Sequence, residues 1–507
     1  MVSKVKTVAF IGMLPTEIIV EAQISSGIAS FCIVGLPDKA VAEAKERIRS
    51  AFFTLGLGFP TRRVTVNMAP ADIPKVGSHY DLPIALAILS SMEVISSEEL
   101  LSYLVMGELG LDGSLNYVSG AICAAMFANE NNLSFVCPQK CANEAVWSGN
   151  QSIIATENLG QLLNHLNGKS QIPFIEPKLI NSNNYNYSED FSDVKGQLIA
   201  KRALEIAACG RHNVLMIGPP GSGKSMLASR LRTILPQLSA KEMLETTCIY
   251  SLAGMLPEDG IIYNPPYRTP HHSSSLVAMV GGGSNAKPGE ISLAHNGVLF
   301  LDELPEFQRQ TMEALRQPLE DKCITISRAK EHITYPANIQ LIAAMNPCKC
   351  GYFGIQNKEC SKAPMCAKEY LNKISGPVLD RFDIILYINN ISNSELLTNS
   401  SSDTSPTIRA RVQAVHELQI RRSERHNVVS NQLNGQINNK YLETIANMTD
   451  DATKLMKDVL DRAYLSARGF HKIIKVARTI ADMRNSECVS SNDISEALQY
   501  RKNINEI

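Results

Sequence analysis

The sequence predicts an α/β protein with a parallel sheet at its centre, and three observations support this expectation. A glycine-rich loop lies between a strand-like run and a helical run in residues 213–234. Further apolar runs alternate with helical sequence through the middle of the chain, which is typical of a parallel sheet covered on both faces. Residues 406–507 have helical periodicity and no convincing strand, which predicts a helical bundle.

The length and composition are those of an ordinary multidomain protein. The chain has 507 residues, of which 20% are charged, and a formal net charge of -1. At roughly 100 to 200 residues per domain, we expect about three domains. The balanced charge gives no general sign of nucleic-acid binding, so any such contact must come from local segments.

The sequence also indicates a compartment. No stretch approaches the roughly 18 uncharged apolar residues of a membrane-spanning helix, and residues 1–20 lack the small-residue cleavage site of a signal peptide. Twelve cysteines are too few for a disulfide scaffold, and we expect them to be mostly reduced. These features predict a cytoplasmic protein without a membrane contact.

Two polar, asparagine-rich stretches divide the chain, because they contain too few apolar residues to pack. They are residues 181–193 and 389–406. The expected organisation is an N-terminal domain (1–170), a linker (171–192), a central domain (193–390), a second linker (391–405) and a helical C-terminal domain (406–507).

The first two domains differ in their pattern of elements. The N-terminal block mixes strand-like and helical runs, which predicts an α+β domain. Its strand candidates are Ser30–Val34 and Arg63–Asn67, and its helix candidates are Asp38–Leu55 and Leu82–Ser90. The central block has its strand candidates at Asn213–Ile217, Gly297–Leu301 and Ile339–Ala344. Ligands of parallel sheets bind at the carboxyl ends of such strands.

The glycine-rich loop has the spacing of a phosphate-binding loop, G-x-x-x-x-G-K-S. Its residues are Gly218, Pro219, Pro220, Gly221, Ser222, Gly223, Lys224 and Ser225. The glycines let successive N–H groups face a phosphate, and the following helix adds positive potential. Lys224 is expected to reach the β and γ oxygens, and Ser225 to ligate Mg²⁺. The flanking strand and helix favour this reading over a chance match.

Polar residues end two of the other strand candidates. Asp302 and Glu303 follow Gly297–Leu301, and Asn346 follows Ile339–Ala344. We expect Asp302 to position Mg²⁺, Glu303 to polarise the attacking water and Asn346 to orient it. Taken alone, the acidic pair could simply begin a helix and Asn346 could be a turn former.

Longer segments resemble the magnesium-chelatase-like family of AAA+ ATPases. They include DVKGQ at 193–197, GPPGSGKS, the run from Tyr267 to Glu320, AAMNPCKCG, ISGPVLDRFD and SARGFHKIIKVARTIADM. The resemblance covers nearly the whole chain, and implies an AAA+ core with a helical lid and ATP and Mg²⁺ as cofactors.

The same resemblance assigns roles to further residues. It implies that Val194 and Gln197 lie beside the adenine and that Asn346 is the first sensor residue. Arg381 matches the arginine finger that reaches a neighbouring subunit, and Arg478 matches the second sensor in the lid. A guanidinium presented from a neighbour can stabilise charge on the transferring phosphoryl group, so the resemblance implies a ring, expected to be a homo-hexamer.

The N-terminal domain contains PKVGSHYDLPIA from Pro74 and GELGLDGSL from Gly107. Through these segments it resembles the Lon-protease domain fold, which is related to ribosomal S5 domain 2. A peptidase of this fold needs a serine beside a lysine. The position of the nucleophile is occupied by His79, with Ser78 next to it, and the segment expected to carry the lysine reads Ser119-Gly-Ala-Ile122. We therefore expect a domain without the catalytic dyad and without peptidase activity.

Four cysteines gather in the loop after the third central strand candidate. Cys348, Cys350, Cys360 and Cys366 could together close a tetrahedral Zn²⁺ site. Their spacing is irregular, C-x-C followed by C-x₅-C, so a reduced loop without metal stays an open alternative.

Two segments are candidates for the channel of a ring. One is residues 271–287, which is glycine-rich and contains Lys287; the other is residues 327–332, a hairpin tip with Arg328 and Lys330. Their cations could follow a phosphate backbone, although solvated surface turns are an equal alternative. His271 and His272 could bind a metal, but a polar turn without an acidic partner is the favoured reading.

The resemblance favours one function and leaves two alternatives. The favoured function is an ATP-driven helicase that binds single-stranded or branched DNA and promotes branch migration in natural transformation. The first alternative is the ATPase subunit of a metal-inserting chelatase, which would act with chelatase partner subunits. The second is an AAA+ chaperone that remodels proteins.

Overall fold

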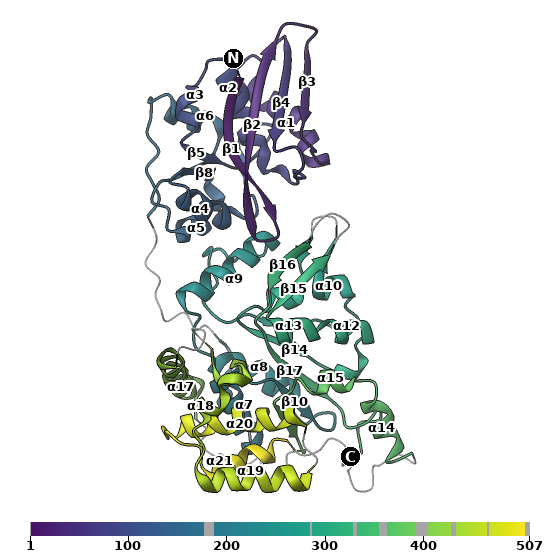
Figure 1. Cartoon of the computed structure of the whole chain (residues 1–507). Coiled ribbons are helices and arrows are strands. Elements are labelled where there is room, and N and C mark those ends of the chain that lie inside the picture. The colour runs from purple at the N-terminus through teal and green to yellow at the C-terminus, as the bar shows by residue number, and fades with distance from the viewer. Residues whose placement is uncertain are drawn as a thin grey trace.

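The computed structural model describes residues 2–176, 187–283, 286–327, 332–353, 362–390, 403–426, 432–463 and 466–501. Three parts follow one another along the long axis of the molecule (Figure 1). The N-terminal part lies at one end, the central sheet in the middle and the C-terminal helices at the other end. Within the described residues, no helix combines the length and the apolar composition needed to cross a bilayer.

The N-terminal part is a mixed sheet with helices packed against it. The seven strands have the order β3-β4-β2-β1-β5-β8-β9. They are β1 (Val2–Ile11), β2 (Leu14–Ser25), β3 (Ser30–Val34), β4 (Arg63–Ala69), β5 (Tyr103–Val105), β8 (Ser134–Pro138) and β9 (Ile153–Thr156). The main helices are α1 (Lys39–Thr54), α2 (Asp81–Ser91), α4 (Ala121–Glu130) and α6 (Leu159–Leu166). The two predicted strands and two predicted helices are confirmed as β3, β4, α1 and α2.

Local chemistry explains why these helices form where they do. The Asp38 carboxylate accepts a hydrogen bond from the Val41 N–H at 2.8 Å, which caps the start of α1. Ten of the eleven residues of α2 are buried, because this helix lies under the β1 and β2 strands. Asp81, the first residue of α2, is an exception to its apolar surroundings, and its carboxylate is paired with Arg47.

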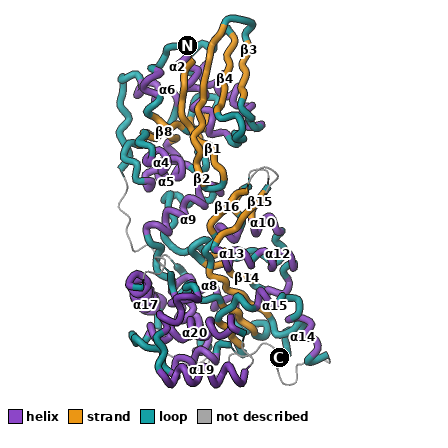
Figure 2. Tube along the Cα trace, in the orientation of Figure 1, coloured by secondary structure: helices purple, strands orange, loops and turns teal. Residues whose placement is uncertain are grey.

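The central part contains a five-stranded sheet in the order β11-β14-β17-β10-β18, and every pair is parallel. The strands are β10 (Val214–Ile217), β11 (Tyr267–Arg268), β14 (Val298–Leu301), β17 (Gln340–Met345) and β18 (Ile384–Tyr387). The three strand candidates of this block are confirmed as β10, β14 and β17. Strands are at the core of this part, with helices on both sides (Figure 2).

Two longer helices flank the phosphate-loop strand, and shorter elements surround them. The longer helices are α7 (Leu198–Gly210) and α8 (Lys224–Ile234). A hairpin, β15 (Cys323–Ser327) and β16 (His332–Pro336), extends from the sheet toward the N-terminal part (Figure 1). The shorter elements include α10 (Leu276–Val280), β12 (Gly281–Gly282), β13 (Lys287–Pro288), α12 (Arg309–Ala314), α13 (Arg316–Asp321), α14 (Met365–Leu371) and α15 (Gly376–Leu379).

The C-terminal part is helical in its described residues, as predicted. Its helices are α17 (Ser405–Arg425), α18 (Leu442–Ala446), α19 (Asp450–Ala463), α20 (Ala467–Met483) and α21 (Ser491–Gln499). Buried residues of α20, such as Ile473 and Ile480, share one apolar cluster with Ala203 and Ile206 of α7. The helical part is therefore packed directly on the helix that precedes the phosphate-loop strand.

Helix α9 (Ala240–Ala253) joins the N-terminal part to the central part. Cys248 and Leu252 of α9 pack with Ile122 and Cys123 of α4 in one apolar cluster. Ser251 adds a polar contact, because its hydroxyl accepts a hydrogen bond from the Gly120 N–H at 2.9 Å and donates one to the Glu144 carboxylate.

Glu144 is the most unusual group in this contact. Its side chain is buried, and burial raises its pKa to about 7. The Ser251 hydroxyl and the Ile122 N–H both donate to it and partly oppose that shift.

Candidate nucleotide-binding site

The phosphate loop lies at the carboxyl end of β10, between that strand and α8. Gly221 and Gly223 have φ angles of 77° and 87°, which L-residues with a side chain rarely adopt. At Gly218, a Cβ atom would lie 2.3 Å from the Ile388 carbonyl oxygen, so only glycine fits beside the end of β18. Strand, loop and helix therefore follow in the order that the sequence predicts.

Lys224 lies inside this loop. Its Nζ donates to the carbonyl oxygens of Gly218 and Pro219 at 2.9 and 2.8 Å, and to Asn346 Oδ1 at 3.2 Å. Burial lowers the pKa of Lys224, and the Asp302 and Glu303 carboxylates oppose this shift. The ammonium is thus held at the centre of the loop by acceptors that a phosphate oxygen can replace.

Ser225 and Asp302, the two expected ligands of Mg²⁺, lie next to each other. The Ser225 hydroxyl donates to Asp302 Oδ2 at 2.7 Å. A hydroxyl and a carboxylate oxygen at the carboxyl edge of a parallel sheet are a donor set that suits Mg²⁺, which takes few protein ligands and completes its shell with water and phosphate. The two residues are far apart in sequence, and they meet because β10 and β14, which lie on either side of β17, end at the same edge of the sheet.

Glu303 has an exposed carboxylate and an unexpected partner. Its backbone has a φ of 51°, and its Oε2 lies 3.5 Å from His272 Nδ1. The expectation that the histidine pair has no acidic partner is therefore wrong, because the loop after β11 folds back toward the end of β14. The His271 and His272 rings stack with centroids 4.1 Å apart.

Val194 and Gln197 line a small hollow of about 150 Å³ beside the phosphate loop. Met226 and Leu227 of α8 form its other wall, and almost all of its surface is apolar. The Gln197 side chain donates to the Asn389 carbonyl oxygen at 2.7 Å, which ties this wall to the end of β18. An apolar slot next to a phosphate loop suits a flat heterocyclic base.

Arg381 is not near this site. The Asn213 side chain donates to the Arg381 carbonyl oxygen at 3.0 Å, and Asn213 precedes β10. Arg381 therefore lies at the amino ends of the parallel strands, whereas the phosphate loop follows their carboxyl ends. Arg381 is therefore on the opposite edge of the sheet from the phosphate loop of its own chain, and its role as arginine finger stays a prediction.

Glu320 and Arg468 lie beside Arg381. Neither residue was among the site residues expected from the sequence. The Arg381 guanidinium donates to the Glu320 carboxylate, and Arg468 Nη2 lies 3.8 Å from the same carboxylate oxygen. Arg468 belongs to SARGF, the start of a segment that resembles the family. This resemblance was the one signal in the sequence that pointed to Arg468.

Arg478 lies inside the helical part, away from the nucleotide loop. Its guanidinium pairs with Asp482 at 2.8 Å and donates to the carbonyl oxygens of Ala446 and Glu487 at 3.2 and 2.8 Å. Only 1% of its surface is exposed. In this arrangement Arg478 stabilises the lid, and its role as second sensor stays a prediction.

Three of the four loop cysteines are close together. The sulfur atoms of Cys348, Cys350 and Cys366 all lie within 4.8 Å of one another, while Cys360 lies outside the described residues. Three thiols in one place are suitable ligands for a soft divalent metal such as zinc. The loop also contacts the phosphate loop, because a Cβ atom on Gly351 would lie 2.7 Å from Pro220 Cδ.

In the N-terminal part, Ser78 and His79 have partners other than a lysine. The Ser78 hydroxyl donates to the Glu108 carboxylate. The His79 ring contacts the Val8 carbonyl oxygen through Nε2 at 2.9 Å, and burial lowers its pKa to about 4. Both side chains line a cavity of about 490 Å³ that also includes Lys287 and Ile333 of the central part.

The channel candidates are only partly described. Lys287 lies in β13, which pairs with β12, and the hairpin β15–β16 confirms the predicted hairpin. Arg328 and Lys330 lie outside the described residues, as do parts of both expected linkers, 177–186 and 391–402.

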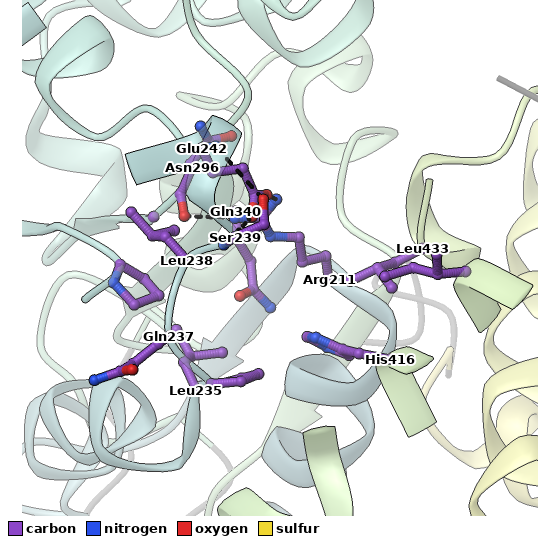
Figure 3. Close-up of a pocket in the computed structure, with 14 residues that line it drawn as sticks. Arg211, Leu235, Gln237, Leu238, Ser239, Glu242, Asn296, Gln340, His416 and Leu433 are labelled. Carbon is purple, nitrogen blue, oxygen red and sulfur yellow. Dashed lines mark hydrogen bonds and ion pairs between the residues drawn. The ribbon is translucent and has the colours of Figure 1, made fainter. Parts of the chain in front are cut away.

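A separate cavity of about 140 Å³ lies between the central part and the C-terminal helices (Figure 3). Arg211 and Gln340 point toward it from the amino ends of the strands, and His416 points from α17. Gln340 donates to the carbonyl oxygens of Ala207 and His212, each at 2.9 Å, and the His416 ring contacts the Ala208 carbonyl oxygen at 2.9 Å. The His416 contact joins the two parts, whereas the Gln340 contacts lie within the central part, and all of these groups are at the opposite edge of the sheet from the phosphate loop.

The parallel sheet, the phosphate loop and the Ser225–Asp302 pair define a P-loop nucleotide-binding core of the AAA+ type. Three family models match successive segments: "Subunit ChlI of Mg-chelatase" (20–141), "Magnesium chelatase, subunit ChlI" (190–396) and "Magnesium chelatase, subunit ChlI C-terminal" (402–501).

Similarity to complete proteins extends over nearly the whole chain. The chain is 40% identical over 499 residues to competence protein ComM of Haemophilus influenzae, covering 97% of this chain and 96% of that protein. It is 41% identical over 498 residues to the uncharacterized protein YifB of Salmonella typhimurium, covering 98% and 96%. It is 40% identical over 501 residues to YifB of Escherichia coli, covering 98% and 97%. The chain therefore belongs to the magnesium-chelatase-like family, in the group of ComM and YifB.

Proposed function

We propose that this protein is an ATPase that works as a cytoplasmic ring, expected to be a homo-hexamer, and moves DNA. The observation on which the proposal depends is the separation of Arg381 from the phosphate loop. Each chain has a nucleotide loop at one edge of its sheet and Arg381 at the other. Such a chain completes a hydrolytic site only with a second copy.

The roles of the nucleotide-site residues follow from their positions. The loop N–H groups and Lys224 bind the phosphates, and Ser225 and Asp302 hold Mg²⁺, which supplies charge stabilisation at the phosphoryl oxygens. Val194 and Gln197 border the slot for the base. Glu303 accepts a proton from the attacking water, and Asn346, whose Oδ1 contacts Lys224, orients that water.

The neighbouring copy supplies Arg381. Its planar guanidinium can bind two phosphate oxygens at once, which favours the transferring group in the transition state. The name of the relative ComM refers to competence, and this supports DNA as the proposed substrate. Branch migration during transformation is the role that we propose for the motor. The channel segments 271–287 and 327–332 are the proposed DNA contacts.

The N-terminal part is proposed to have the Lon-protease-like fold without peptidase activity. Ser78 donates to an acidic side chain, and the segment from Ser119 to Ile122 offers no amine that could activate it. We also propose that Cys348, Cys350, Cys360 and Cys366 hold a structural zinc ion.

The decisive experiment measures ATP hydrolysis with single-stranded, duplex and four-way-junction DNA, together with strand displacement on the junction. Stimulation by branched DNA and movement of the junction are expected. Glu303→Gln should bind ATP and form rings while its turnover falls at least about 100-fold, because general base catalysis contributes that much. Lys224→Ala should lose ATP binding.

Two results would redirect the proposal. The DNA motor is refuted if no DNA stimulates ATP hydrolysis and the protein does not move the four-way junction. The chelatase alternative would be favoured if adding this protein to chelatase partner subunits increased porphyrin metallation. Magnesium chelatase is the protein that the matching family models name.

A further inference from the structure

Glu320 lies between two arginines that come from different parts of the chain. Arg381 follows α15 in the central part, and Arg468 is the second residue of α20 in the C-terminal part. Both guanidinium groups are paired with the same oxygen of Glu320. A single carboxylate therefore acts as counter-ion for two cations across the boundary between the core and the helical part.

These three residues line a cavity of about 480 Å³ in which positive charge predominates. Its basic side chains are Arg211, Lys322, Arg381, Arg468, Lys472 and Lys475. Its acidic side chains are Glu320, Asp321, Asp380 and Asp383. Asp383 is already paired with Lys472 at 3.3 Å and with His212 at 3.6 Å. The cavity is thus suited to an anion.

The anion cannot be the nucleotide of the same chain. The cavity includes Asn213, which precedes β10, whereas the phosphate loop follows β10. In the proposed ring, the anion that reaches this edge is the triphosphate of a neighbouring copy. Carboxylate and phosphate oxygens both accept hydrogen bonds from the guanidinium fork, so they compete for the same donors.

The exposure of the three side chains differs in a way that suits exchange. The Arg381 side chain is only 9% exposed, whereas those of Glu320 and Arg468 are 50% and 57% exposed. The half-exposed carboxylate can turn into solvent, and a phosphate oxygen that replaces it keeps the guanidinium of Arg381 paired. The buried arginine then stays in place while its partner changes.

We propose that Glu320 is an internal counter-ion that closes the arginine site of the separated chain and leaves it when a neighbour's triphosphate arrives. The inference rests on the proposed ring and adds a regulatory contact to it. Assembly requires that the Glu320–Arg381 contact breaks, and this costs free energy. The contact therefore sets a threshold in protein concentration below which ATP is not hydrolysed. The partner is thus a second copy of this chain with nucleotide bound.

The test is Glu320→Gln, which keeps the shape of the side chain and removes its charge. The full-length protein is titrated from low to high concentration at saturating ATP, and both the ATPase rate and the ring mass are recorded. The concentration for half-maximal rate is expected to fall about threefold, a modest effect because Glu320 is half exposed and water screens its charge. Glu313→Gln is the control for loss of a carboxylate elsewhere, because Glu313 is paired with Arg316 at 3.1 Å and does not line the cavity of Arg381.

A second variant separates this inference from the proposed function. In the double variant Glu320→Gln/Arg381→Ala, rings should form at no lower concentration than in Arg381→Ala alone. The reason is that the guanidinium freed by Glu320→Gln is absent. An unchanged or higher half-maximal concentration in Glu320→Gln, with unchanged thermal unfolding, overturns the counter-ion role. Full activity of Arg381→Ala rings refutes the proposed contribution of the neighbour's arginine, whatever Glu320→Gln shows.

Discussion

His272 Nδ1 lies 3.5 Å from Glu303 Oε2, and this contact connects the loop after β11 with the end of β14. The carboxylate that we propose as the general base is thus held by a ring from a neighbouring loop. The side chains are 36% and 54% exposed, so the contact can open without a large cost. The loop that carries His272 also belongs to the first channel segment, so the proposed base is in contact with a proposed DNA-binding segment.

We expect His272→Ala to raise the ATPase rate without DNA about twofold, because an exposed contact of this kind restrains Glu303 only weakly. The KM for ATP should not change, since His272 does not border the slot for the base. Steady-state kinetics with and without DNA measure both. His271→Ala is the control, because His271 contacts Ser273 at 2.8 Å instead. Equal rates in all three proteins would show that the contact has no influence on Glu303.

Arg478→Ala is expected to destabilise the helical part by about 3 kcal/mol, because it removes a buried partner of Asp482. The midpoint of chemical unfolding, followed by the signal of the C-terminal helices, measures the effect. Arg421→Ala should leave the midpoint unchanged, since its pair with Glu417 is exposed. A stable Arg478→Ala protein that has lost only ATP hydrolysis would favour the sensor role over the structural one.

The contact between the N-terminal and central parts should weaken as the pH rises. The pKa of Glu144 is raised from 4.5 to about 7, so its stabilising contribution is complete below about pH 4.5 and is lost as the pH passes 7. The change corresponds to about 3 kcal/mol at most. Thermal unfolding from pH 5 to 8 should show the parent losing stability relative to Glu144→Gln. Parallel curves for the two proteins would contradict the assignment.

The cysteine loop should bind one zinc ion per chain. Native mass spectrometry and elemental analysis are expected to find the metal in the parent protein and not in Cys366→Ser, because the site loses one of its thiolates. Cys32→Ser, which alters a cysteine in β3, should keep it. Removal of the metal should also lower ATP affinity, since the loop packs on Pro220 of the phosphate loop. Equal metal content in all three proteins would locate the metal elsewhere.

The sequence allows the phosphate site to be predicted well, because its information is local. The strand, the glycines, Lys224 and the helix are consecutive, and their spacing encodes the loop directly. Asp302 and Asn346 could also be placed, since parallel strands bring their carboxyl ends to one edge. The resemblance to a family supplied the rest of the expected site.

Contacts between distant segments could not be predicted in this way. Nothing in the sequence near His272 points to Glu303, and nothing near Glu320 points to Arg468, because these pairs depend on how loops and helices fold over the sheet. The position of Arg478 shows the same limit. A helical arginine at a family position was expected at the nucleotide, and the structure buries it in the lid.

The direction of the central sheet has a consequence for symmetry. In a two-fold dimer, residue i of one copy meets residue j of its partner and j meets i, so such a dimer joins the phosphate-loop edge to the Arg381 edge only if one surface patch includes both edges. In the proposed ring a head-to-tail contact joins these unlike edges, and it leaves an unused edge on every outermost copy until the chain of subunits closes on itself.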